Sequence, residues 1–236
     1  MRWFLVILGL CWGLASPQEG LAEDILSAAE YRVLESGQMD SVALMVNRLR
    51  LMMRLKGKEA ARPAVPALIR RVSALLGAAD STRQQMEELE HYMLDLLVKI
   101  DDVRAKSVLI EGMVASGPRV ASGLLALEAV PEVIDSLGSH RAGMGWGAIM
   151  ALMEMQKRRP ERFGMKETNK IKDHLLRRVQ ADGGAKMAFI KGLGVFGDDS
   201  VISLLQQVAE QDTFSGPRGK YVNRDCAEKV LLEIRP

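Results

Sequence analysis

The sequence is poor in the residues that most often carry out catalysis. Its 236 residues include only two cysteines and three histidines, and the histidines are far apart. The motifs His-Glu-x-x-His and Gly-x-Ser-x-Gly and the phosphate-binding P-loop are all absent. No nucleophile can therefore be paired with a base. We predict a protein that is not an enzyme and that has no catalytic residue, cofactor or metal.

Aromatic residues are also scarce, at 5% of the chain, whereas Leu, Ala and the 14 Met are frequent. Leu, Ala and Met favour helices, and β-branched residues never form the alternating runs that are typical of strands. The composition therefore predicts an all-α fold. Because the basic residues have no aromatic residues among them to stack on bases, we expect no nucleic-acid partner.

The N-terminal segment has the composition of a secretory signal peptide. One basic residue precedes an apolar run at 3–14, and a polar stretch then ends in a small-x-small sequence at Ala22. The run is about half of the roughly 20 residues that span a bilayer, so cleavage is favoured over a transmembrane span in the mature protein. We predict a signal peptide at 1–22, a single domain at 23–236, and an extracytoplasmic protein, either periplasmic or secreted.

The same segment leaves two alternatives open. The stretch LGLC at 8–11 is similar to a lipoprotein signal with Cys11 as the modified residue, although Leu10 stands where a small residue is usual. The segment is otherwise either cleaved near Ala22 or retained as an anchor. If Cys11 is removed, Cys226 is the only thiol and no internal disulfide can form. We expect Cys226 to be a small buried apolar residue.

Beyond this segment, apolar residues recur at three- and four-residue steps that Gly, Pro, Asp and Asn interrupt. Two helices are predicted to end at Gly37 and Gly57, with Asp40 capping the second. Five helix pairs follow at a spacing of about 35 residues, which is typical of a helical solenoid. The predicted pairs are 64–76 with 82–99, 102–115 with 118–127, 129–137 with 142–158, 166–180 with 185–196, and 199–211 with 223–234.

Three segments resemble the HEAT-repeat family. AVPALIRRVSALLG at 64–77 and AVPEVIDSLG at 129–138 share an Ala-Val-Pro opening, and GLGVFGDDSVISLLQQVAEQD at 192–212 is similar to a junction between repeats. The similarity extends from residue 63 to the C-terminus. It implies an α-solenoid of about five to six HEAT-like helical hairpins, a fold that mainly binds partners. The family also includes bilin lyases, but these act on cytoplasmic targets, which the signal peptide argues against.

The stretch GLGVFG at 192–197 matches the dinucleotide-binding motif Gly-x-Gly-x-x-Gly. That motif must follow a buried strand, whereas the apolar residues of 185–191 recur at helical steps. Asp198 and Asp199 would also repel a bound phosphate. We predict that the first two glycines let helices approach closely and that Gly197 adopts the left-handed conformation at a helix end.

Glu87, His91 and Asp95 are spaced four residues apart, so on a helix they share one face that could hold a metal. No second histidine is near them in the sequence, and they belong to the acidic stretch EELEHYMLD. We interpret this stretch as a solvated helix face.

Trp146, the only tryptophan outside the N-terminal segment, lies in RAGMGWGAIM at 141–150. The glycines around it weaken a helix by about 1 kcal/mol each unless close packing requires them. Two interpretations remain open: Trp146 packs inward over the turn, or it contacts a partner.

The connection at 212–223 is about twice the usual length of a solenoid turn. Long loops on rigid scaffolds often carry binding residues, and the alternative is an insertion or a cap on the solenoid. Together with the tryptophan, the candidate partner-binding residues are Trp146, Phe214, Arg218, Lys220 and Tyr221.

The formal net charge is only +2, but the charge is unevenly distributed. Residues 41–76 hold eight Lys/Arg against one Asp/Glu, a net +7, and residues 156–178 hold nine against three, a net +6. Charged helix surfaces account for this pattern, and the alternative is two basic patches that meet an anionic surface. We predict an exported scaffold that binds an unidentified protein partner. The second hypothesis is peripheral binding to an anionic membrane or envelope surface, and the third is a HEAT-like lyase.

Overall fold

The computed structural model describes residues 26–78, 80–181, 184, 186–216 and 220–234. These residues form α-helices and short 3-10 helices without any strand, which confirms the all-α prediction. The predicted signal peptide at 1–22 lies outside the described residues. The α-helices are α1 (Ala28–Ser36), α2 (Met39–Lys56), α3 (Val65–Leu76), α4 (Asp80–Ile100), α5 (Lys106–Ala126), α6 (Val130–Ser136), α7 (Met144–Arg158), α8 (Met165–Gln180), α9 (Met187–Phe196), α10 (Ile202–Gln211) and α11 (Val222–Ile234). The 3-10 helices are η2 (Lys58–Ala64), η3 (Val103–Ala105), η4 (Pro160–Arg162) and η5 (Asp199–Val201).

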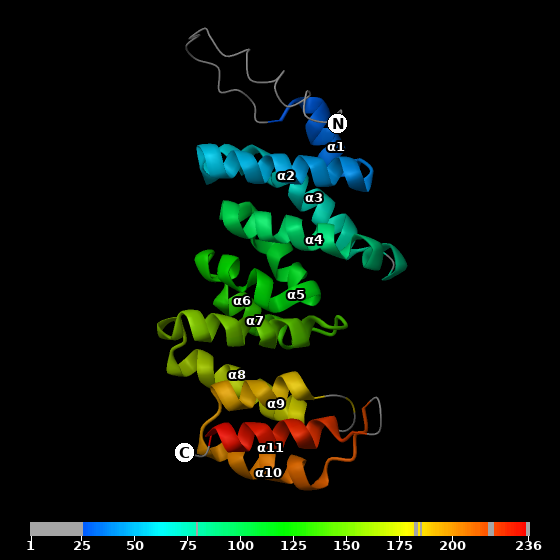
Figure 1. Ribbon diagram of the computed structural model, residues 1–236. Helices are drawn as coiled ribbons and strands as arrows, with labels where there is room; N and C mark the ends of the chain where they lie inside the picture. Colours follow the sequence, from blue (N-terminus) through cyan, green and yellow to red (C-terminus); the bar gives the residue numbers. More distant parts are fainter. Residues whose placement is uncertain (1–25, 79, 182–183, 185, 217–219, 235–236) are drawn as a thin grey trace, which may run out of the picture.

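The helices are stacked along one long axis, with the N-terminal and C-terminal helices at opposite ends (Figure 1). Consecutive helices pack in pairs: α1 on α2, α3 on α4, α6 on α7, α8 on α9 and α10 on α11. One row of contacts joins α2, α4, α5, α7, α9 and α11, and another joins α1, α3, α5, α6 and α8. The stack therefore has two layers of helices. The turns within pairs lie on one edge, at the right in Figure 1, and the connections between pairs lie on the other edge.

The helix boundaries follow the apolar period of the sequence closely. Only the predicted pair 102–115 and 118–127 differs in form, because both belong to α5, which has a break at Ser116 with φ −160° and ψ 91°. Pro118 follows this break, and proline cannot donate the backbone hydrogen bond that a continuous helix needs there. The two halves of α5 therefore form a short hairpin that contacts helices of both layers.

The first two helices end at the predicted glycines. Gly37 is the C-cap of α1, and Gly57 is the C-cap of α2 with a φ of 84°, which favours glycine. The prediction that Asp40 caps α2 is wrong. Gln38 occupies the N-cap, and Asp40 lies in the first turn, where its negative charge still suits the positive end of the helix dipole.

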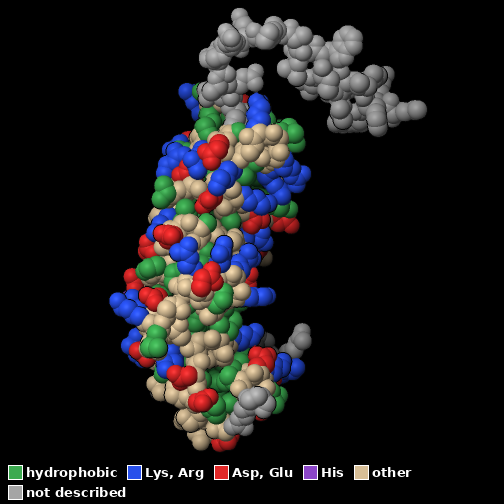
Figure 2. Space-filling model, turned by 90° about the vertical axis from the view of Figure 1, so that its left-hand side faces the viewer, with side chains coloured by type: hydrophobic (Ala, Val, Ile, Leu, Met, Phe, Trp, Pro, Cys, Tyr) green, Lys and Arg blue, Asp and Glu red, His purple; other side chains and the backbone are tan. Residues whose placement is uncertain are grey.

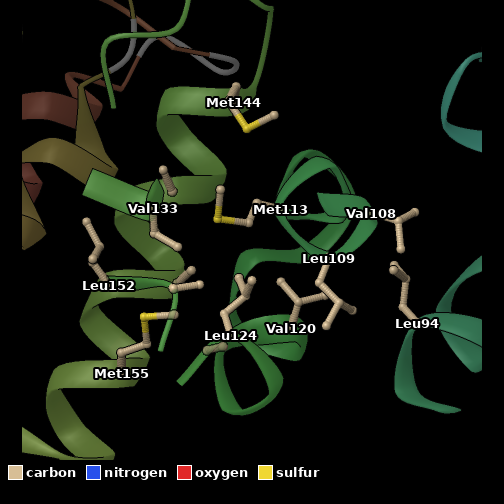
Figure 3. Close-up of a cluster of buried hydrophobic side chains, with 14 of the residues drawn as sticks. Leu94, Val108, Leu109, Met113, Val120, Leu124, Val133, Met144, Leu152 and Met155 are labelled. Atoms are coloured by element: carbon tan, nitrogen blue, oxygen red, sulfur yellow. The ribbon is translucent and has the colours of Figure 1, made fainter. Parts of the chain in front are cut away.

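The core lies between the layers and is densest around α5 and α7. Figure 3 shows side chains from both halves of α5 meeting those of α4, α6 and α7. Members of this cluster that are fully shielded from solvent are Leu94, Leu109, Met113, Val120, Leu124, Val133, Leu152 and Met155. Burying a Leu, Val or Met side chain contributes about 1.5–3 kcal/mol. The cluster therefore joins α4, α5, α6 and α7 firmly in the middle of the stack.

In the part of the chain that the structure describes, one helical stretch, Val103–Ala126, is long and apolar enough to span a membrane by length and composition. The most apolar part of this stretch is 50% buried inside the protein. The stretch comprises η3 and α5, and α5 contacts α3, α4 and α7. Its apolar composition therefore matches its place at the centre of the stack.

The glycine-rich stretch at 192–197 belongs to α9 and its C-cap, and no strand precedes it in the described residues. A Cβ at Gly192 would lie 2.8 Å from Ile149, and a Cβ at Gly194 would lie 2.8 Å from Val230. These two glycines therefore allow close helix packing, as predicted. The expectation for Gly197 is wrong, because its φ is −81°. Its lack of a side chain instead leaves room for the carbonyl oxygen of Leu193.

Candidate functional site

Trp146 is in the first turn of α7 and is 48% exposed. The N-cap of this helix is Gly143, whose left-handed φ of 77° turns the chain into the helix without a side-chain cap. Residues on either side of the tryptophan, Gly145 and Gly147, are buried against neighbouring helices. Because successive helical residues are about 100° apart, burial of both flanking positions directs Trp146 outward. The interpretation that Trp146 packs inward is wrong.

Gly147 fixes the position of this first turn against the centre of the stack. A Cβ at Gly147 would overlap the carbonyl oxygen of Met113, and a Cβ at Gly117 would overlap the carbonyl oxygen of Gly147. The backbones of α5 and α7 thus touch at two glycines. Close packing therefore requires glycine at position 147, as expected for a glycine inside a helix, whereas Gly143 is favoured by its left-handed φ.

A surface pocket of about 290 Å³ opens beside the tryptophan. It lies between the α6–α7 turn and the facing sides of α8 and α9. The Arg178 guanidinium carbon is 5.2 Å from the centre of the Phe189 ring, in cation–π contact. The absent side chain of Gly145 leaves room for both, since a Cβ there would lie 3.4 Å from the Arg178 guanidinium. The pocket is lined by Ser139, His140, Arg141, Ala142, Gly143, Gly145, Trp146, Arg178 and Phe189.

The pocket is basic. Arg141 donates a hydrogen bond to the carbonyl oxygen of Leu76 at 3.4 Å, which ties the α6–α7 turn to the end of α3. Among the described residues, neither Arg141 nor Arg178 forms an ion pair with an acidic side chain, and no acidic side chain lines the pocket. Two arginines without an acidic partner next to an exposed tryptophan can bind an anionic group and an apolar group together.

His174 lies beneath the same turn. Its Cε1 atom is 3.8 Å from the position that a Cβ of Gly138 would take, and its Nε2 atom is buried without a hydrogen-bond partner among the described residues. Burial lowers the pKa of His174 from its ordinary value of 6.5, a hydrogen bond with the backbone of Leu137 opposes this, and Arg177 and Arg178 lower it further. At a pH at which an exposed histidine begins to gain a proton, His174 is therefore still neutral.

We expect the melting temperature to fall as the pH drops from about 7 to about 5, with part of the fall due to His174. The unfolded chain gains this proton near its ordinary pKa, whereas the folded chain gains it only at lower pH, so acid favours unfolding. In His174→Gln the fall should be smaller. Thermal unfolding at several pH values measures it, with exposed His140→Gln as the control. Equal falls in wild type and His174→Gln would contradict this role.

The connection between α10 and α11 is held by a buried asparagine. Asn223 is 0% exposed; it accepts a hydrogen bond from the backbone N–H of Lys186 at 2.8 Å and donates to the carbonyl oxygen of Gly184 at 3.0 Å. It also donates to Asp212 Oδ1 at 3.1 Å. The backbone N–H of Phe214 donates to the same Asp212 oxygen at 2.9 Å. The beginning of the connection is therefore an ordered turn that joins two helix pairs.

The predicted candidate residues of this connection differ in their exposure to solvent. Tyr221 is exposed and lies 4.6 Å from the Arg224 guanidinium carbon, Lys220 is exposed, and Phe214 is half-buried. Arg218 lies outside the described residues. The connection shares the edge of the stack that holds the α6–α7 turn (Figure 1), but none of its residues lines the Trp146 pocket. Of the four candidates that the structure describes, only Trp146 lines this pocket, so the structure does not join them in one site.

The described residues contain no group of three His, Cys, Asp or Glu side chains that could hold a metal. Glu87, His91 and Asp95 are on α4 as predicted, and Asp95 forms an ion pair with Arg119 at 2.9 Å. Cys226 is buried, as predicted, and burial raises the pKa of its thiol. A protonated, buried thiol is a poor nucleophile.

The basic segment 156–178 does not form a bare positive patch. Lys and Arg side chains are interspersed with Asp and Glu along the edge that faces the viewer in Figure 2. A further pocket of about 330 Å³ is lined by three arginines of this segment, but each of the three already has an acidic partner. Five of the nine basic residues are paired, namely Arg158 with Glu154, Arg159 with Glu161, Arg162 with Glu128, Lys170 with Asp135, and Lys172 with Asp198.

Trp146 was the only residue of this pocket that the sequence singled out. Arg141 adjoins the glycine-rich turn, and that proximity was a usable signal. Nothing in the sequence links Arg178 or Phe189 to Trp146, because they belong to the next helix pair. No family model, no curated protein and no solved structure matches the chain. The functional argument therefore rests on the pocket itself.

Proposed function

We propose that this protein is an exported α-solenoid of HEAT-like helical hairpins that binds a protein partner through the pocket beside Trp146. The composition of residues 1–22 supports export. The pairwise packing of helices and the two rows of contacts along the stack support a solenoid. The Ala-Val-Pro openings of α3 and α6 support the resemblance to HEAT repeats.

The observation that carries the binding role is an exposed tryptophan in one pocket with two arginines that have no acidic partner among the described residues. Tryptophan and arginine are the residues most enriched among those that dominate binding energy at protein interfaces. The pocket of about 290 Å³ is large enough for one or two side chains of a partner. Arg141 and Arg178 select a carboxylate, and the Trp146 ring selects an apolar side chain. The partner we propose is a protein with an exposed acidic segment that also carries an apolar residue.

The test places a photo-crosslinking amino acid at position 146 of the full chain in the cells that produce it. A second protein carries the same amino acid at Val103, which is 71% exposed and belongs to η3, in a connection between helix pairs on the opposite edge. We expect a protein adduct of defined mass from position 146 and none of that mass from position 103. Mass spectrometry of the adduct should identify an acidic segment in the partner.

The double variant Arg141→Glu/Arg178→Glu should reduce the yield of this adduct about tenfold or more, because like charges now face the acidic segment. The matched variant Arg158→Glu/Arg159→Glu changes the same number of charges at the other edge and should leave the yield unchanged. An adduct that survives Arg141→Glu/Arg178→Glu would contradict the role of the pocket. Adducts of equal mass and yield from both crosslinker positions would contradict it as well.

A further inference from the structure

We propose that α2 is the surface with which this protein lies against an anionic lipid membrane. This inference goes beyond the proposed function and uses residues at the N-terminal end of the stack, away from the Trp146 pocket. Its starting point is an unusual helix face. Leu44, Leu51 and Leu55 of α2 are 63%, 54% and 70% exposed.

These three leucines form one stripe. Their spacings of seven and four residues place them within about 20° of one direction on a helix with 3.6 residues per turn. The stripe is about 16 Å long at 1.5 Å per residue. The buried residues of the same helix, which include Val42, Val46 and Leu49, point the opposite way into the core. The helix therefore has one apolar face that the stack covers and a second that it leaves open.

Basic side chains border the open stripe. Arg48 lies on one side of it and Arg54 on the other, and both are exposed. Arg48 pairs with Glu30, whereas Arg54 forms no ion pair among the described residues. In α2 as a whole, four basic residues stand against the single acid Asp40. Leucines flanked by arginines are the pattern of helices that lie in the interface of an anionic bilayer.

The position of α2 favours a membrane as the partner that covers the leucine stripe. The helix is at the N-terminal end of the stack and packs on α1 (Figure 1). Residues 1–25 precede the described chain and contain the apolar run 3–14. If that run is retained, it holds the beginning of α1, and with it α2, at the surface of the bilayer. The stripe and the run then act together, which is how a single weak anchor becomes a stable one.

A second copy of this chain fits the stripe less well. Face-to-face packing of two α2 helices would bring the four basic residues of each copy together, and Asp40 and the Glu30 that pairs with Arg48 offset only part of this charge. Like charges at an interface oppose association. Three leucines also cover far less than the roughly 800 Å² that each partner buries in a stable dimer. Anionic lipid headgroups match the arginines, and acyl chains match the leucines.

The test follows the surroundings of position 51 in the full chain with Leu51→Cys labelled by an environment-sensitive fluorophore. Cys11→Ser removes one competing thiol, and the other, Cys226, is buried. The control label is at Leu232→Cys, because Leu232 is equally a leucine, is 78% exposed and belongs to α11 at the far end of the stack. The apolar run brings both labelled proteins to vesicles alike, so only the position of the label distinguishes them.

With vesicles of phosphatidylcholine and phosphatidylglycerol, we expect the label at 51 to shift to shorter wavelength and to be quenched by brominated acyl chains. The label at 232 should change little. Pure phosphatidylcholine vesicles, or salt well above the physiological range, should reduce the response at 51 several-fold, because screening weakens the arginine contacts. Leu44→Gln/Leu55→Gln in the same background should lower the membrane-contacting fraction about tenfold or more, since each leucine contributes up to about tenfold.

An unchanged label at 51, or equal responses at 51 and 232, would overturn the inference. A spectral shift at 51 that appears without vesicles and grows with protein concentration would show a second copy on the stripe and would overturn it too. Far-ultraviolet circular dichroism and melting temperatures should match between all labelled proteins, since the changed leucines are exposed. The crosslinking at position 146 does not involve α2, so each proposal can fail while the other stands.

Discussion

Gly147→Ala is expected to destabilise the protein by about 2 kcal/mol, although alanine is the better helix former. A Cβ at this position would overlap the Met113 carbonyl oxygen and would lie 2.6 Å from the Met113 carbonyl carbon and 3.2 Å from the Val114 nitrogen. All three are backbone atoms, so no side-chain rotation relieves the contact. The gain in helix propensity is about 1 kcal/mol, whereas overpacking typically costs about 1–3 kcal/mol and more where backbones must separate.

Thermal unfolding should show this loss as a melting temperature lower by about 4–8 °C. Gly117→Ala should behave in the same way, because its Cβ would overlap the Gly147 carbonyl oxygen and lie 3.0 Å from the Ala151 nitrogen. Gly77→Ala is the control, since its nearest atom, the Ser73 carbonyl oxygen, is 3.5 Å away. A melting temperature of Gly147→Ala equal to that of Gly77→Ala would mean that α5 and α7 do not cross at these glycines.

Asn223→Ala should cost about 3 kcal/mol, the largest effect we expect from a single polar side chain. The change removes an acceptor from the Lys186 backbone N–H and a donor from the Gly184 carbonyl oxygen. A buried polar group that loses its partner costs about 1–3 kcal/mol. Asp212 also loses a neutral donor at 3.1 Å, which leaves it beside Lys186, whose Nζ atom is 3.7 Å away.

Urea unfolding measures the global loss, and hydrogen exchange shows where it begins. Because helix pairs in a stack contact mainly their neighbours, the loss should appear first in α10 and α11, whose amides should exchange faster while those of α5 and α7 change little. Asn169→Ala, an exposed asparagine of α8, should change stability by less than about 0.5 kcal/mol. Uniformly faster exchange along the whole chain would contradict local opening of the terminal pair.

Local patterns predicted much of this fold because helices depend on residues that are near in sequence. The period of apolar residues located the helix pairs, and the break in α5 fell between the two predicted helices, at Ser116. The glycines Gly192 and Gly194 were correctly assigned to helix packing, because their surroundings repeat at helical steps. Gly197 was assigned the wrong conformation, since a chain can leave a helix by more than one route and the sequence does not distinguish them.

The candidate site was harder to predict because its residues are far apart in the sequence and come together only in the folded chain. The sequence left open whether Trp146 packs inward or contacts a partner, and only the packing of its flanking glycines decided that it faces outward. The pocket is basic because α8 places Arg178 beside the α6–α7 turn, which holds Arg141. The same kind of contact offsets part of the charge of 156–178, since Arg162, Lys170 and Lys172 pair with acidic residues elsewhere in the chain.

The sequence by itself therefore determined the helical class and the order and approximate ends of the helices. These features depend on hydrogen bonds and side chains within a few turns of one chain segment. Only the tertiary structure decided which helix faces are covered and which charges remain unpaired. That difference is why Leu49 belongs to the core while Leu44, Leu51 and Leu55 on the same helix stay exposed. A helix can be apolar on two sides, and only its neighbours determine which side becomes a surface for binding.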